Sequence, residues 1–170
     1  MHRTIRYALG STALFQLAVA LPTVARAQAT GDHACSLVDA AELKGLTKRD
    51  DYGQKPQASD PSQLRQGTTE CDYLSISYTL TSNMTKEWFA RDRRTTEATP
   101  DRWKVESISG LGDEAYYMWD PRPGSDRSVG IVVRAGGKRL SIGELASSDS
   151  LEASKSLMLS LAKLALPKLK

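Results

Sequence analysis

Histidine is almost missing from this chain, and cysteine is nearly as rare. Its 170 residues include two histidines and two cysteines. His2 belongs to the leader described below, which leaves His33 close to the start of the remaining chain. A nucleophilic triad needs a buried, oriented imidazole, and a zinc site needs several nitrogen or sulfur ligands. We therefore expect neither hydrolase chemistry of this kind nor zinc binding, and we predict no cofactor.

Charge is also scarce over the first part of the chain. Two arginines precede a stretch, residues 7–25, that has no acidic or basic side chain apart from a tyrosine phenol, and the small-residue sequence ARAQA ends it. A basic start, an apolar middle and a small-residue cut site are typical of a secretory signal peptide. The stretch approaches the length of a membrane span, but Pro22 and the cut site favour cleavage. We predict that residues 1–29 are a cleaved signal peptide, cut after Ala27 or Ala29, and that the mature protein is periplasmic or secreted.

Cleavage would leave a chain without excess charge. It would remove three of the 23 basic residues (Arg3, Arg6 and Arg26) and none of the 20 acidic ones, so 20 of each sign would remain. A neutral domain gives no support for binding to nucleic acid or to a membrane surface. Cys35 follows Gly31-Asp32-His33-Ala34, which is not a lipobox, so we expect no stable membrane anchor after cleavage.

The two cysteines, Cys35 and Cys71, are expected to form one disulfide in an oxidising compartment. Between them, residues 47–70 contain only Tyr52 and Leu64 as large apolar side chains, which predicts a long polar surface loop. A bridge that closes about 36 residues stabilises by roughly 4 kcal/mol in the chain-entropy model. A reactive or metal-binding thiol pair is the alternative, and the spacing, far from C-x-x-C, disfavours it.

The most conspicuous motif is GLGDEA, which is followed by a run of aromatic residues. Its members are Gly110, Leu111, Gly112, Asp113, Glu114 and Ala115. Glycine loops that bind phosphate open onto a helix, whereas here β-favouring residues follow. Neighbouring carboxylates on a strand point apart, and calcium would need more oxygen ligands. We interpret the motif as a structural turn that starts a strand, with both acids in solvent.

Hydrophobic periodicity predicts that residues 30–170 form a single α+β domain. About four to five antiparallel strands are expected, and the last three should form a meander. These strands are expected at residues 71–80, 103–108, 115–119, 129–133 and 139–145. In the first of them, Leu74, Ile76, Tyr78 and Leu80 would face the core, and Cys71 would point to the other side or precede regular pairing.

Three helices are expected around this sheet. Ser36 would cap the first, which would end near Gly45, and Thr85 would begin the second. Basic residues on the second helix suggest a solvated face rather than a site for an acidic partner. A long final helix after Ser150 has a stripe of apolar residues that includes Met158, and it should lie across the sheet as the main core-filling element.

Three segments together resemble a known group of proteins. They are Cys35-Ser36-Leu37 at a helix start, Cys71-Asp72-Tyr73 at a strand start, and GLGDEA. The chain is similar to the small exported domains of unknown function found in bacterial envelope lipoproteins, especially of actinobacteria, over roughly residues 35–165. The resemblance implies a PsbP-like α/β sandwich and transfers no catalytic residues. The missing lipobox is a departure from this group.

These features predict a non-enzymatic, secreted or periplasmic domain that binds an envelope protein or a small or lipid ligand. One alternative is an extracytoplasmic enzyme whose carboxylates, Asp113, Glu114 or Glu144, come together on folding. Another is a carrier that holds an apolar ligand between the sheet and the final helix.

Overall fold

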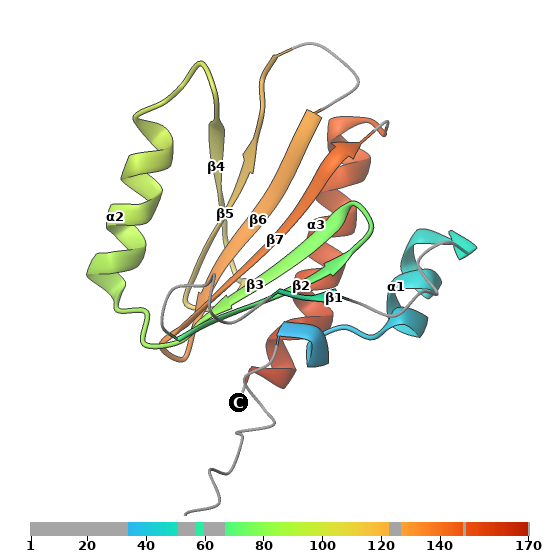
Figure 1. The fold of residues 1–170 in the computed structure, drawn as a ribbon. Coiled ribbons are helices and arrows are strands. Elements are labelled where there is room, and N and C mark those ends of the chain that lie inside the picture. The colour runs from blue at the N-terminus through green and yellow to red at the C-terminus, as the bar shows by residue number, and fades with distance from the viewer. Residues whose placement is uncertain (1–33, 51–56, 60–66, 123–126, 148, 170) are drawn as a thin grey trace, which may run out of the picture.

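The computed structural model describes residues 34–50, 57–59, 67–122, 127–147 and 149–169. Its centre is one antiparallel sheet of seven strands in the order β1-β2-β3-β7-β6-β5-β4 (Figure 1). The strands are β1 Gln57–Ala58, β2 Thr68–Tyr73, β3 Ile76–Thr81, β4 Lys104–Ile108, β5 Glu114–Trp119, β6 Arg127–Ala135 and β7 Lys138–Ser147. The predicted signal peptide, residues 1–29, lies outside the described residues.

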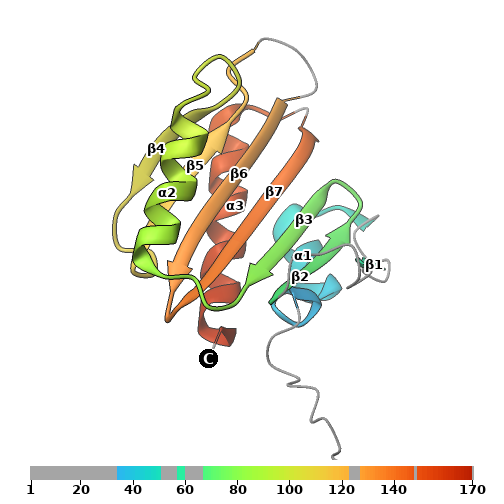
Figure 2. The same ribbon diagram turned by 60° about the vertical axis from the view of Figure 1, so that its left-hand side comes forward.

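Helices lie on both faces of this sheet. They are α1 Ala40–Thr47, α2 Lys86–Glu97 and α3 Leu151–Ala165, with short 3₁₀ turns at Ala34–Ser36 and Leu166–Lys168. Helix α2 covers the half of one face formed by β4, β5 and β6, and α3 and α1 lie on the opposite face (Figures 1 and 2). The predicted α+β class with an antiparallel sheet and a long C-terminal helix is therefore confirmed.

The predicted number of strands, about four to five, is too low. Residues 71–80 form two strands, because the chain reverses at Leu74 and Ser75 and β2 pairs with β3 as a hairpin. Leu74 has φ of +50° and an exposed side chain. The reversal was missed because no Gly, Asn or Pro marks it. The hairpin also brings Cys71 to the same buried side as Tyr78, its register partner, so the prediction that the cysteine points to the other side is wrong.

The first helix starts later than expected. Its N-cap is Asp39 rather than Ser36, and Asp39 and Glu42 form a complete capping box: the Glu42 amide donates to Asp39 at 2.8 Å, and the Asp39 amide donates to Glu42 at 2.9 Å. The helix continues past Gly45 to Thr47, where Lys48 ends it in the left-handed conformation. Leu37, inside the predicted helix, is instead buried ahead of it.

The segment predicted as a polar loop, residues 47–70, includes parts of the sheet. Residues 57–58 form β1, which pairs with β2, and residues 68–70 are the first half of β2. Both residues of β1 are exposed, in keeping with the polar character of the segment.

The later elements follow the predictions closely. Thr85 caps α2 and Ser150 caps α3, each by accepting a hydrogen bond from a backbone amide in the first turn. The meander of β5, β6 and β7 is present. Its second turn contains Gly136 and Gly137, both with positive φ. Such a pair is typical of tight hairpins, because glycine adopts positive φ without a steric cost.

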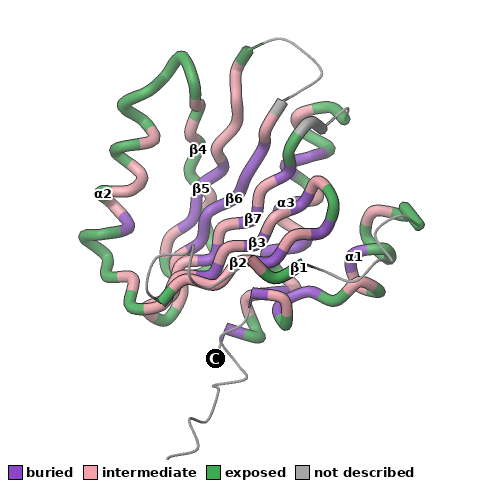
Figure 3. The backbone as a smooth tube through the Cα atoms, viewed as in Figure 1, coloured by how far each residue is buried: buried purple, intermediate pink, exposed green. Residues whose placement is uncertain are grey.

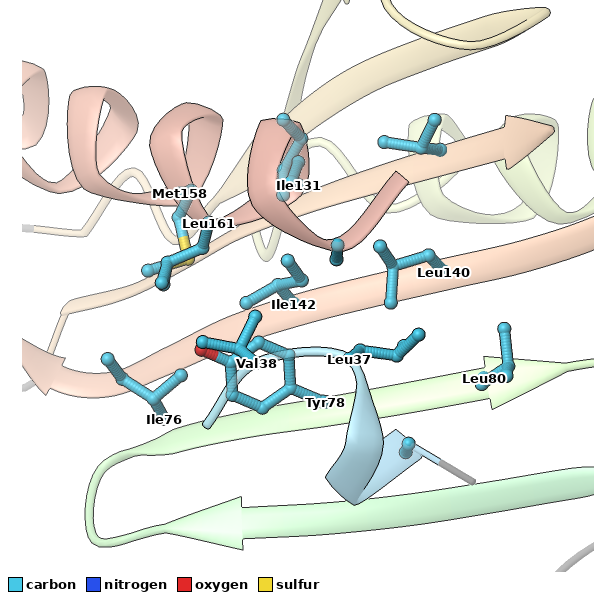
Figure 4. Packing of buried hydrophobic residues seen from close by; sticks show 14 of the residues in the cluster. Leu37, Val38, Ile76, Tyr78, Leu80, Ile131, Leu140, Ile142, Met158 and Leu161 are labelled. Atoms are coloured by element: carbon cyan, nitrogen blue, oxygen red, sulfur yellow. The ribbon is translucent and has the colours of Figure 1, made fainter. Parts of the chain in front are cut away.

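The main core lies between the sheet and α3. Met158 and Leu161 of α3 are fully buried, and they belong to one cluster with Tyr78, Ile131 and Ile142 of the strands (Figure 4). Buried residues follow the central strands and the inner side of α3 in Figure 3, whereas α2 is mostly exposed. A smaller cluster, centred on Phe89, Tyr116 and Val132, fixes α2 to its face of the sheet.

A disulfide joins the N-terminal segment to this core. Cys35 and Cys71 are bonded, with their Cα atoms 5.0 Å apart, as predicted. Two hydrogen bonds flank the bridge: the Ala34 amide donates to Thr69 Oγ1 at 3.0 Å, and the Tyr73 hydroxyl donates to the Val38 carbonyl at 2.8 Å. Such a bridge is consistent with an oxidising, extracytoplasmic location. Among the described helices, none is long and apolar enough to span a bilayer.

Candidate functional site

A pocket of about 340 Å³ lies where the end of α1 meets α3 and β7. Its α3 wall consists of residues at positions i, i+3, i+4 and i+7, which form one face of a helix. This face turns toward α1 and not into the core. The lining residues are Leu46, Thr47, Arg49, Glu144, Asp149, Ala153, Ser156, Leu157 and Ser160. Leu157, the neighbour of the fully buried Met158, is only partly buried and lines this pocket.

The α1 wall is held in place by a buried side chain, by an ion pair with the C-terminal turn and by a hydrogen bond within the helix. Leu43 is fully buried, and the Glu42 carboxylate receives an ion pair from Lys168 at 2.8 Å, so the helix is tied to the C-terminal 3₁₀ turn. At the end of the helix the Thr47 hydroxyl donates to the Leu43 carbonyl at 2.9 Å. These contacts hold the C-terminal end of α1, whose Leu46 and Thr47 line the pocket.

Glu144 is the unusual residue of the site. It lies on β7 between its register partners Ile76 and Val129, with its side chain only 4% exposed. Within the described part of the chain, its Oε2 atom is buried and has no hydrogen-bond partner. A buried polar oxygen without a donor costs about 1–3 kcal/mol. The fold thus keeps a polar group at a strand position next to the inward-facing Leu140 and Ile142.

The pocket carries charges of both signs. Glu144 and Asp149 supply carboxylates, and Arg49 supplies the basic side chain among the lining residues. The C-terminal end of a helix carries a partial negative charge, because its last carbonyls point outward. The end of α1 therefore adds to the negative side.

The hydroxyl groups of the walls are used mainly as donors within the fold. Thr47 donates to the Leu43 carbonyl, and Ser160 donates to the Ser156 carbonyl, each at 2.9 Å. A hydroxyl has one hydrogen and two lone pairs. Thr47 Oγ1 also accepts from the Arg49 amide at 3.3 Å, so most of the hydrogen-bonding capacity of Thr47 is used within the fold.

The GLGDEA motif forms a turn whose geometry requires glycine. Gly110 and Gly112 have φ of +75° and +60°. A Cβ atom at Gly112 would lie 2.6 Å from the Arg134 carbonyl oxygen and 2.7 Å from a Val133 methyl carbon. The strand β5 follows at once, as the sequence predicts. The motif thus brings the backbone against β6.

The two acids of this motif reach solvent, with side chains 46% exposed for Asp113 and 34% exposed for Glu114, but they are also paired within the fold, which the sequence did not predict. Both reach the guanidinium of Arg134: Asp113 at 3.1 Å and Glu114 at 3.2 Å. Asp113 also accepts a hydrogen bond from the Gly136 amide at 3.2 Å. The acids therefore meet because Asp113 precedes the strand, where the alternation of side chains does not yet apply. They fasten the turn to the hairpin of β6 and β7.

The structure does not bring the three candidate carboxylates together. Asp113 and Glu114 are held by Arg134, which alternates with Val133 and shares the α2 side of the sheet with Val132. Glu144 lies on the α3 side and five positions beyond Arg139, the register partner of Arg134. One site cannot use all three acids.

The apolar-carrier alternative places a ligand between the sheet and α3. In the structure, buried side chains of the strands and of α3 pack against one another in this interface. Sequence analysis missed one of them, Lys155, which is 8% exposed. Its ammonium group lies 4.2 Å from the ring centre of Trp119 and 2.6 Å from the Glu106 carboxylate. Burial lowers the pKa of Lys155, but the carboxylates of Glu106 and Glu152 outweigh burial and the net pKa is raised.

The pocket was also missed, although one signal pointed to it. Leu140 and Ile142 were assigned to the inner face of their strand, and the same alternation places residue 144 inward. Glu144 is therefore expected to be buried next to these apolar residues, and a buried polar group calls for an explanation.

No family model matches this chain, and no curated protein or solved structure matches it either. Within the described residues, no group of three or more His, Cys, Asp or Glu side chains is arranged to hold a metal ion. The candidate site is therefore defined by its own geometry: a small pocket whose lining includes a buried acid, an exposed acid, a basic residue and hydroxyl groups.

Proposed function

We propose that this chain is a non-enzymatic, secreted or periplasmic domain that binds a small ligand in the pocket between α1, α3 and β7. The observation that carries the proposal is the pocket of about 340 Å³, whose lining includes Glu144, a buried acid with one oxygen that lacks a donor. Natural proteins keep such destabilising groups chiefly where function requires them.

The location and the family are part of the same proposal. The Cys35–Cys71 bridge and the predicted signal peptide support an exported protein. An antiparallel sheet with helices on both faces supports a relationship to the exported envelope domains of PsbP-like type that the sequence resembles.

Binding is favoured over catalysis because the pocket holds a single buried acid. Asp113 and Glu114 are paired with Arg134 on the other side of the sheet. The remaining carboxylate of the lining, Asp149, belongs to an exposed residue. An acid–base pair or a carboxylate pair needs two groups at a common substrate.

Native mass spectrometry of protein exported by its own host tests the proposal. We expect a co-purifying small mass that is lost in Ser156→Trp, which fills the pocket from an exposed position. The matched control is Thr95→Trp on the exposed side of α2, which should retain the mass. Equal loss in both variants, or turnover of esters, glycans or peptides that Glu144→Gln abolishes, would contradict a non-enzymatic binding domain.

A further inference from the structure

We propose that two copies of this chain associate through β4, so that their sheets join into one continuous antiparallel sheet. Strand β4, Lys104–Ile108, is the last strand of the sheet and pairs with β5 alone in the described part of the chain (Figure 2). An edge strand keeps unpaired amide and carbonyl groups along its outer side, and these groups can pair with the edge of another chain. This surface is separate from the pocket, which lies between α1, α3 and β7.

The helix beside β4 is fixed to the inner strands and not to the outer edge. Phe89 of α2 packs against Tyr116 of β5 and Val132 of β6. Asp92 of α2 pairs with Arg139 of β7 at 2.9 Å. Three of the five residues of β4 are accordingly exposed, and the other two are only partly buried. The edge is therefore open to a second strand.

The charges of β4 make this edge complementary to itself. Lys104 and Glu106 are two positions apart, so their side chains point to the same face of the sheet. That face is the α3 side, because Glu106 contacts Lys155 of α3 at 2.6 Å. Lys104 has no ion-pair partner in the described part of the chain. When two antiparallel copies of β4 meet about a two-fold axis at Val105, each Lys104 lies opposite Glu106 of the second copy.

This register forms two ion pairs by symmetry. The Cβ atoms of directly opposite residues lie about 4.5–5.5 Å apart, and a pair of opposite charges at that distance stabilises the pairing. The Glu106 side chain is 54% exposed, so the second copy's lysine can reach it. A carboxylate has two oxygens with about four lone-pair sites, so Glu106 can accept from Lys155 and from the second copy's Lys104 together.

The other registers of β4 with itself lack these pairs. A two-fold axis at Lys104 would place two lysines opposite each other, and an axis at Glu106 would do the same with two glutamates. Like charges directly opposite are destabilising. An axis at Ser107 or Ile108 places neither charge opposite a charge of the other sign. The charges thus select the register centred on Val105.

The α2 side of the strand contributes an apolar contact in the same register. Val105 is partly buried and packs against the small cluster that holds α2 on the sheet. With the two-fold axis at this residue, the two Val105 side chains lie directly opposite each other. The small clusters of the two copies then meet across the axis, and the pairing removes apolar surface of Val105 from water.

Sedimentation velocity of the mature chain over a range of concentrations tests the proposal. We expect an equilibrium between monomer and dimer. Lys104→Glu or Glu106→Lys alone places like charges opposite each other at both symmetry-related pairs, so each should weaken self-association about tenfold or more. An equal mixture of the two variants should associate as strongly as the wild type, because every glutamate at these positions then faces a lysine. Lys86→Glu, the same charge change on exposed α2, is the matched control and should self-associate as the wild type does.

The proposal is overturned if the wild-type chain stays monomeric at every concentration. It is equally wrong if the chain dimerises but neither substitution weakens the dimer, or if the mixture does not restore it, because the interface then lies elsewhere. Should Glu106→Lys not fold, hydrogen exchange of the wild type provides a second measurement. The amides of β4 should be better protected at high than at low protein concentration. Equal protection would contradict pairing through this edge.

Discussion

At the scale of single residues, Glu144 and Gly112 are each unusual at their positions, for different reasons. Glu144 is buried where its strand neighbours are apolar, and Gly112 has no side chain because the Arg134 carbonyl and Val133 occupy the space. The unpartnered oxygen of Glu144 is expected to lower the stability of the fold, whereas glycine at position 112 avoids a steric clash. Substitutions at the two positions should therefore have effects of opposite sign.

Glu144→Met should stabilise the protein without ligand. The substitution removes a buried acceptor that has no donor and keeps a side chain of similar length, so we expect the free energy of unfolding to rise by about 0.5–2 kcal/mol. Urea unfolding at neutral pH measures the change. A loss of more than about 1 kcal/mol would show that Glu144 has a stabilising partner in the fold, and the argument for a ligand would fail.

Gly112→Ala should be strongly destabilising, and Gly110→Ala provides the control. Both positions have positive φ, which costs an L-residue about 1–2 kcal/mol. A Cβ at Gly110 would meet nothing within 4 Å, whereas at Gly112 it would clash at 2.6 Å. We expect an additional loss of about 1–3 kcal/mol at Gly112. Urea unfolding of the two variants checks this, and equal losses would contradict the close approach.

At the scale of elements, the hairpin between β2 and β3 has an unusual residue in its turn. It turns at Leu74 and Ser75, and Leu74 is exposed with φ of +50°. The first central residue of a two-residue hairpin turn is commonly glycine, because positive φ disfavours a branched side chain. The turn therefore stores a modest strain that the surrounding pairing maintains.

Leu74→Gly should relieve this strain. We expect an increase of about 1 kcal/mol in the free energy of unfolding, because the left-handed conformation has no steric penalty in glycine. Leu145 is a matched control: it is 60% exposed, as against 58% for Leu74, but lies within β7. Leu145→Gly should cost about 0.5–1 kcal/mol. If both substitutions destabilise equally, the turn at Leu74 is not strained.

The elements that sequence analysis found are those with local signals. Glycine pairs mark the β6–β7 hairpin, and Thr85 and Ser150 mark the starts of α2 and α3. The start of α1 was predicted wrongly because two N-cap signals compete there. Both Ser36 and Asp39 have an acid three residues later, and the structure uses Asp39. The reversal at Leu74 has no local signal, because it is imposed by the pairing of β2 with β3.

The candidate site was harder to foresee than the fold. Its walls come from α1 and α3, which lie more than a hundred residues apart, and no periodicity predicts that two helices leave a space between them. The buried acid in its lining was predictable, since the alternation of β7 places Glu144 inward. The pairing of the two acids of GLGDEA with Arg134 was missed because Arg134 lies on another strand.

At the scale of the whole molecule, the disulfide and the sheet stabilise different parts of the chain. The sheet organises the chain from β2 onward, and the bridge fixes the N-terminal segment, with α1 directly after it, to β2. The α1 wall of the pocket thus depends on a bond that an oxidising compartment supplies.

Removing the bridge should therefore cost both stability and the pocket. For Cys35→Ala with Cys71→Ala we expect a loss of roughly 4 kcal/mol, from a closed loop of 36 residues. Urea unfolding gives the loss, and hydrogen exchange should show reduced protection in α1 before the central strands. Unchanged stability would mean that the bridge adds nothing to the fold.

Alkaline pH should weaken the whole fold from about pH 9 upward. Burial raises the pKa of Tyr73, Tyr116 and Tyr117 above their ordinary value of 10.0, and that of Lys155 is raised above 10.5. Each group holds its proton more tightly when folded, so the stability it contributes is present below the unfolded value and is lost as pH rises toward the folded one. The free energy of unfolding should be flat below about pH 9 and then decrease.

Urea unfolding over this range, combined with the ultraviolet absorbance of tyrosinate, provides the measurement. Ionisation of the buried tyrosines should coincide with unfolding, and Tyr116→Phe should make the decrease less steep because one raised group is removed. The fully buried Tyr116 lies against Phe89 under α2, so its ionisation requires at least this helix to leave the sheet. A decrease of the same steepness in Tyr116→Phe would show that this face of the molecule opens independently of the rest.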